Sequence, residues 1–127
     1  MRFIEEKKFL KEKLGKITKS ERLIVERRRR GNTPKAEAAR RKMSIHTYKR
    51  FEKRDTYNEI NFHGKYFAPL GIFEICHLLR KRAKKTGTVV ACEMGVSKGW
   101  ISLMERGIRP MGALINYWMD QYNDDKA

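Results

Sequence analysis

The sequence predicts an all-α protein in which one three-helix unit occurs twice. Three observations predict this: apolar residues recur at helical spacing, capping residues and glycines separate the apolar stretches, and one stretch of chain repeats without a gap. The segment "SKGWISLMERG" (97–107) is the clearest helix. Ser97 can cap its start, and Ile101 and Met104 lie three residues apart on one face. Gly107 can end it.

Composition limits both the size and the partners of the protein. The 127 residues suffice for one ordinary domain or for two very small helical ones. The 30 Lys and Arg against 15 Asp and Glu give a formal net charge of +15, which favours a polyanionic partner. Nucleic acid is favoured over a membrane, because no apolar run approaches the roughly 18 residues of a spanning helix. The first residues also lack the apolar core of a signal peptide, so we expect a cytoplasmic protein with no membrane association.

The repeat appears when residues 44–54 are placed under residues 97–107, an offset of 53. The same offset, extended toward the N-terminus, pairs identical residues: Glu21 with Glu74, Arg27 with Arg80, Arg29 with Arg82, Thr33 with Thr86, Ala38 with Ala91, Ser44 with Ser97 and Glu52 with Glu105. Because the register holds over about 34 residues without a gap, we interpret the chain as containing one unit twice.

The second copy divides into three helices with short connections. Ile72, Ile75 and Leu79 lie at helical spacing in the first of them, and Thr86 or Thr88 can cap a second helix over residues 89–94. Gly95 can end that helix, and Ser97 begins the third. Two helices joined by a short turn that contains Gly are typical of a helix-turn-helix, whose last helix is presented to the major groove of DNA.

The stretch "TVVACEMGVSKGWISLMERGIRP" resembles the Cro/C1-type (XRE-like) helix-turn-helix family. The residues that carry the resemblance are Ala91, Gly95, Val96, Ser97, Ile101, Ser102, Glu105 and Gly107. The first copy, "TPKAEAARRKMSIHTYKRFEKR", is a degenerate version in which Lys42 replaces the turn glycine and Arg41 an apolar residue. The resemblance implies two tandem bundles of about three to five helices, similar to that of lambda repressor.

The predicted organisation has five segments. An N-terminal helix (1–18) precedes the basic first copy (19–54), and a linker rich in aromatic residues (55–71) follows, which could form a small hairpin. The second copy with its closing helix covers 72–123, and 124–127 form a tail.

Positions for base contacts follow from the resemblance. It implies that the groove-facing residues are Ile45, His46 and Arg50 in the first copy and Lys98, Gly99 and Leu103 in the second. Arg50 could bind guanine with two hydrogen bonds, whereas Gly99 and Leu103 offer none. We therefore expect the first copy to contact bases and the second to contact them poorly, although the second matches the family better.

Phosphate contacts are expected from the basic side chains around these helices. The candidates are Arg28, Arg30, Ser44, Lys49, Lys53, Arg54, Ser97 and Arg106. Residues 19–54 hold 14 Lys and Arg against 4 Glu, a net charge of +10, and residues 72–127 hold 9 against 6, a net charge of +3. The first copy is thus the stronger candidate, while a structural role is favoured for Arg27.

The closing segment "MGALINYWMDQYN" places Trp118 and Tyr122 on one apolar face. Two alternatives stay open for this face: it completes the core of the second copy, or it contacts another chain, as in a homodimer.

We expect neither an enzyme nor a metal or cofactor site. No nucleophile or carboxylate pair has a context typical of catalysis, and His63 and His77 lack further ligands at suitable spacing. Cys76 and Cys92 lie on apolar helix faces, so we expect both to be reduced core residues.

Charge and resemblance together favour sequence-specific binding of double-stranded DNA by a small bacterial or phage transcriptional regulator, most simply a repressor. The alternative is an interaction protein, of the antiactivator or inhibitor type, that binds a regulator or polymerase. RNA binding through the basic copy is a third alternative.

Overall fold

A computed structural model describes residues 2–53 and 66–124 of the chain, and these residues form eight α-helices and no strand. The all-α prediction is confirmed. The chain divides into two compact units. The basic unit is residues 16–67, and the split unit combines residues 1–15 with 68–127.

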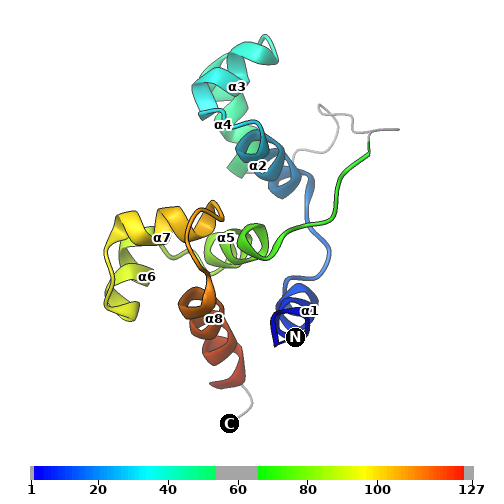
Figure 1. Ribbon diagram of the computed structural model, residues 1–127. Helices are drawn as coiled ribbons and strands as arrows, with labels where there is room; N and C mark the ends of the chain where they lie inside the picture. The colour runs from blue at the N-terminus through cyan, green and yellow to red at the C-terminus, as the bar shows by residue number, and fades with distance from the viewer. Residues whose placement is uncertain (1, 54–65, 125–127) are drawn as a thin grey trace. The chain divides into compact units, whose positions relative to one another are not determined.

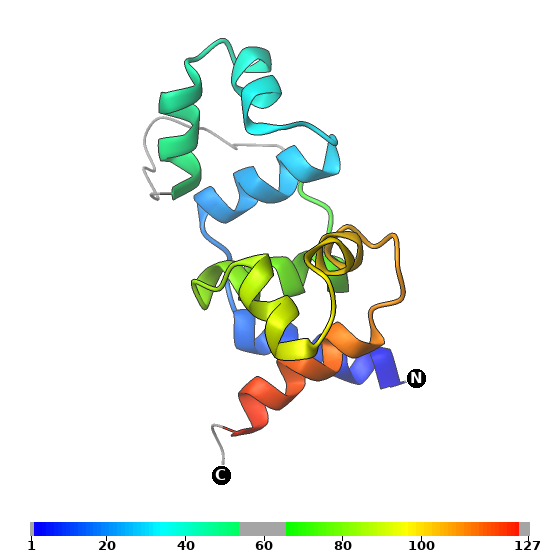
Figure 2. The same cartoon turned by 90° about the vertical axis from the view of Figure 1, so that its left-hand side faces the viewer.

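The basic unit contains α2 (Lys19–Arg29), α3 (Pro34–Arg40) and α4 (Ile45–Lys53), seen in Figures 1 and 2. Helix α4 packs against both α2 and α3. The core of the basic unit is small. The buried apolar side chains are Leu23, Ile24, Val25, Ala38, Tyr48 and Phe51, and Met43 packs against Leu23 and Phe51. Because Tyr48 and Phe51 are three residues apart, one face of α4 is held in the core and the opposite face is left in solvent.

Each helix of the basic unit begins at a polar cap. The Thr18 hydroxyl accepts from the Glu21 amide while the Glu21 carboxylate accepts from the Thr18 amide, which is a complete capping box at α2. The Thr33 hydroxyl caps α3, with Pro34 as its first residue. The Ser44 hydroxyl accepts from the Thr47 amide at the start of α4.

The split unit brings α1 (Arg2–Leu14) together with α5 (Ile72–Arg82), α6 (Gly87–Met94), α7 (Lys98–Glu105) and α8 (Gly112–Asp124). Figures 1 and 2 show α1 beside α8, and α1 also packs against α5. Leu10 and Leu14 are buried there, and the Arg82 guanidinium donates to the Leu14 carbonyl. The sequence analysis set the N-terminal helix apart, whereas the structure makes it part of this unit.

The same three-helix order occurs in both units at the offset of the repeat. Helices α5, α6 and α7 begin at residues 72, 87 and 98, each 53 residues after the starts of α2, α3 and α4 at 19, 34 and 45. At the turn between the last two helices, Lys42 has φ of 56° and Gly95 has φ of 73°. Lys42 corresponds to Gly95 at the offset of 53, and it adopts the left-handed conformation for which glycine is the usual residue.

Two predictions of the sequence analysis concern segments that are only partly described. The hairpin expected within 55–71 falls mainly on residues 54–65, outside the described residues, and residues 66–71 contain neither helix nor strand. Helix α8 reaches Asp124, where the tail was expected to begin. None of the helices in the described part of the chain is both long and apolar enough to cross a membrane.

Candidate nucleic-acid interface

Helix α4 presents the expected contact residues on one surface of the basic unit. His46, Lys49, Arg50 and Lys53 are exposed, and Ile45 is half-buried. Tyr48 and Phe51 on the other side are 0% and 5% exposed, so the helix cannot rotate without uncovering its core. The exposed Ser44 hydroxyl lies at the N-terminal end of the same helix. The structure thus places the predicted residues 44, 45, 46, 49, 50 and 53 together at α4, whereas Arg28 and Arg30 lie at the end of α2 and Arg54 lies outside the described residues.

Arg27 has the structural role that the sequence analysis favoured. Its Nε donates to Glu52 Oε2 over 2.7 Å, and its Nη1 donates to the Asn32 carbonyl over 3.1 Å. The split unit has the same arrangement at the offset of 53: Arg80 Nε donates to Glu105 Oε2 over 2.8 Å, and Arg80 Nη1 to the Lys85 carbonyl over 3.1 Å. Arg27 thus joins α2 to α4 and to the loop that follows α2, and Arg80 joins α5 to α7 and to the loop that follows α5.

The other arginines of the run 27–30 have different surroundings. Arg28 is half-buried, and the exposed Arg29 places its guanidinium 4.7 Å from the centre of the Phe67 ring. Arg22 lies on the same ring at 4.8 Å. Arg30 Nη1 donates to the Glu37 carboxylate over 2.8 Å. The run is therefore partly held by contacts within the unit.

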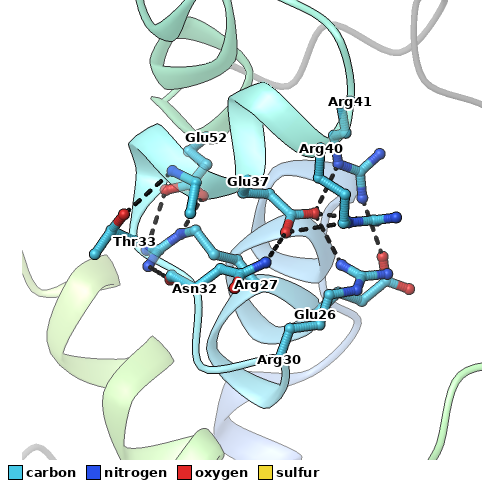
Figure 3. Close-up of polar contacts among 10 residues, drawn as sticks. Glu26, Arg27, Arg30, Asn32, Thr33, Glu37, Arg40, Arg41 and Glu52 are labelled. Atoms are coloured by element: carbon cyan, nitrogen blue, oxygen red, sulfur yellow. Dashed lines mark hydrogen bonds and ion pairs between the residues drawn. The ribbon is translucent and has the colours of Figure 1, made fainter.

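Glu37 lies at the centre of a polar network in the basic unit (Figure 3). Its Oε2 accepts hydrogen bonds from Arg30 at 2.8 Å, Arg41 at 2.9 Å and Arg40 at 3.2 Å. Its Oε1 accepts from the Asn32 amide at 3.0 Å. The Glu37 side chain is 0% exposed, so the carboxylate is reached only by these donors.

The surroundings of Glu37 keep it ionised. Burial alone would raise the pKa of the carboxyl, but the hydrogen bonds from Asn32 and two arginines, with the charge of Arg30, lower the pKa from 4.5 to about 2. Glu37 is not among the residues expected from the sequence. Two sequence signals could have indicated it: the offset of 53 pairs Glu37 with the apolar Val90, and arginines follow Glu37 three and four residues later, at helical spacing.

The corresponding surface of the split unit carries less charge. Lys98 and Gly99 are exposed and Leu103 is half-buried, as expected for an outer face of α7. Ser97 is the N-cap of α7 and the exposed Arg106 is its C-cap, so the two residues lie at opposite ends of the helix. The large exposed apolar side chains nearby are Val89 at 44%, Trp100 at 38% and Ile108 at 60%, with Arg109 5.2 Å from the Trp100 ring.

The structure bears on two expectations about burial. Trp118 is 2% exposed and belongs to the core of the split unit, which agrees with the first of the two alternatives for its apolar face, and Tyr122 beside it is half-buried. The expectation that Cys92 is a core residue is wrong, because Cys92 is exposed, whereas Cys76 is in the core as expected. The buried residues of α6 are Val90 and Ala91, and Cys92 lies outside this buried face of the helix.

Possible metal ligands and similarity to known proteins were the remaining guides to the site. In residues 2–53 and 66–124 no group of three or more His, Cys, Asp or Glu side chains is placed to hold a metal ion. No family model, curated protein or solved structure matches this chain.

Proposed function

We propose that the protein binds double-stranded DNA through the basic unit, with α4 in the major groove, and acts in the cytoplasm as a small transcriptional regulator. The single observation that carries this proposal is the outer face of α4. It combines His46 and Arg50, whose side chains suit base edges, with Lys49 and Lys53, whose charges suit phosphates. The buried Tyr48 and Phe51 hold that face outward.

Charge supports the same proposal. Residues 19–54 hold 14 Lys and Arg against 4 Glu, so a polyanion is attracted to this unit over several ångströms before any contact forms. The order of three capped helices with a tight turn before the third agrees with the helix-turn-helix resemblance. Occupancy of a promoter is enough for repression, so we propose a repressor rather than an activator.

The experiment is a salt series of binding isotherms with two duplexes, one of random sequence and one from the region upstream of the protein's own coding sequence. We expect tighter binding to the upstream duplex and a linear fall of log K with log salt for both. Equal affinity for both duplexes contradicts sequence-specific regulation. Absence of binding at about 50 mM salt contradicts DNA binding altogether.

Single substitutions test which unit contacts bases. Arg50→Ala should weaken binding to the preferred site by roughly 1–3 kcal/mol and change random-duplex binding little, because it removes a bidentate contact to one base. Lys98→Ala is the matched control at a predicted contact position of the split unit, and it should cost less. The reverse result would move base contact to α7. Circular dichroism must first establish that both variants are folded.

A second candidate function is binding to a protein, such as a regulator or polymerase. The observation that favours it is the exposure of three large apolar side chains of the split unit, Val89, Trp100 and Ile108. Trp100→Ser should then abolish capture of that partner and leave DNA affinity unchanged. If Trp100→Ser weakens DNA binding as much as Arg50→Ala does, Trp100 belongs to a DNA contact instead.

A further inference from the structure

Glu37 places a buried charge where the other unit has an apolar side chain. Val90, at the offset of 53, is 0% exposed, and so is Glu37. Two further positions of the basic unit have a charged residue where the split unit has an apolar one: at the offset of 53, Glu26 corresponds to Leu79 and Arg41 to Met94. A buried ion network is a weak source of stability, because desolvation cancels much of the attraction between the charges. Stability alone therefore does not account for this network.

The arginines around Glu37 are not equally neutralised. Arg41 lies on two carboxylates, 2.9 Å from Glu37 and 3.6 Å from Glu26, and its side chain is 17% exposed. The side chains of Arg30 and Arg40 reach Glu37 but are 37% and 46% exposed. A guanidinium has five N–H donors, so Arg30 and Arg40 use one or two of them on the carboxylate and turn others to solvent.

The described ion pairs around Glu37 hold more positive than negative charge. Four arginines (Arg22, Arg30, Arg40 and Arg41) are joined through two carboxylates (Glu26 and Glu37), and these six side chains together carry a net charge of +2. In Figure 3, Arg30 approaches Glu37 from the C-terminal end of α2, where it is the C-cap, and Arg40 from α3. An anion on the outer side would meet donors that are already fixed in direction.

We propose that Glu37 is a positioning residue, whose buried carboxylate holds Arg30 and Arg40 as a preformed clamp for backbone phosphates of duplex DNA. The inference rests on the proposed function and adds a residue and a mechanism to it. Mobile arginine side chains give up much rotamer freedom on binding a phosphate, and the carboxylate removes that cost before DNA arrives. A negatively charged side chain thereby strengthens binding to a polyanion.

Glu37→Gln separates positioning from net charge. The glutamine raises the charge of the unit by one, which by attraction alone would strengthen DNA binding. It also leaves one acceptor oxygen in place of two and turns an amide donor toward the arginines. If Glu37 positions the clamp, binding to random duplex at about 0.1 M salt becomes weaker by about eightfold for each phosphate that the arginines no longer hold. The slope of log K against log salt then flattens by about one for each such phosphate.

Glu52→Gln is the matched control. It makes the same change of charge in the same unit, its side chain is 12% exposed, and it breaks the ion pair with Arg27. We expect this variant to keep the salt slope of the unsubstituted protein, because Arg27 is directed into the unit. Comparison at conditions where circular dichroism shows both variants fully folded removes any effect of stability.

The outcomes are distinct. Weaker binding and a flatter slope for Glu37→Gln, but not for Glu52→Gln, support the clamp. Equal or tighter binding by Glu37→Gln overturns the inference and leaves the proposed function intact, whereas absence of DNA binding by the unsubstituted protein overturns both. If Glu37→Gln does not fold, Arg40→Gln replaces it: a flatter slope supports the clamp, and an unchanged slope overturns it.

Discussion

Glu37 of the basic unit and Val90 of the split unit occupy the same position in two copies of one three-helix order, and both side chains are 0% exposed. One copy thus uses apolar packing and the other a carboxylate with its arginines at an equivalent buried place. The two units thus differ chemically at an equivalent buried position, and this difference leads to the first prediction.

We expect that three charged residues of the network can be replaced by the apolar residues found at the corresponding positions of the split unit. The triple variant Glu26→Leu, Glu37→Val, Arg41→Met should match or exceed the unsubstituted protein in free energy of unfolding, by up to roughly 1–4 kcal/mol, because the two carboxylates and the Arg41 guanidinium are then no longer desolvated. Glu37→Val alone should destabilise the protein, by up to about 3–5 kcal/mol, since it leaves the half-buried Arg41 with only the more distant carboxylate of Glu26 among its two partners. Urea unfolding at neutral pH measures both. A triple variant as unstable as the single one would contradict the equivalence of the two positions.

Acid should destabilise the split unit through Glu105. Burial alone would raise the pKa of this carboxyl, but His77 and Arg80, with Nδ1 and Nε each 2.8 Å from its oxygens, lower the pKa from 4.5 to about 2. Because the folded pKa lies below the unfolded one, the stabilisation, about 3 kcal/mol, is complete above about pH 4.5 and is lost as the pH falls toward 2.

Glu105→Gln tests this dependence by urea unfolding at several pH values. The variant should be less stable than the unsubstituted protein at neutral pH, and the two should converge as the pH approaches 2. Glu93→Gln is the control, since that exposed carboxylate should change the pH dependence little. A constant difference between Glu105→Gln and the unsubstituted protein across this range would contradict the role of Glu105.

The two turns before the third helices predict opposite effects of glycine. Lys42→Gly should stabilise the protein by about 0.5–1 kcal/mol, because φ of 56° is strained for a side chain with a Cβ. Gly95→Ala should destabilise it by about 1 kcal/mol, and only through φ, since an added Cβ would meet no atom within 4 Å.

Gly112→Ala is the control for this pair of substitutions, because Gly112 has equal space and no positive φ. Thermal unfolding followed by circular dichroism measures the changes. Destabilisation by Lys42→Gly would mean that the turn of the basic unit depends on the lysine side chain.

The two cysteines should differ in reactivity. Cys92 is exposed and should react quickly with a thiol reagent such as a disulfide dye. Cys76 should react only after unfolding, since burial, together with the charge of Glu105, raises its pKa. Counting thiols modified before and after adding guanidinium checks this, with Cys92→Ser expected to remove the fast reaction. Fast modification of the Cys92→Ser variant would contradict the burial of Cys76.

Much of the local structure could be predicted from the amino-acid sequence. Helix starts at Thr86 and Ser97 and the turn at Gly95 follow from residues a few positions apart, because capping and helical spacing act over such distances. The outer face of α4 follows in the same way, because the apolar Tyr48 and Phe51 determine which side is buried.

The features that join distant parts of the chain could not be predicted in this way. The docking of α1 onto α5 and α8, the burial of Trp118 and the burial of the Glu37 carboxylate each depend on which surfaces meet. A charged residue in a basic stretch is expected to be solvated until its neighbours are placed, and an apolar face is equally consistent with a core or an interface. Local sequence therefore established where the helices lie, while packing established which charges are enclosed, because burial is a property of the assembled unit rather than of a segment.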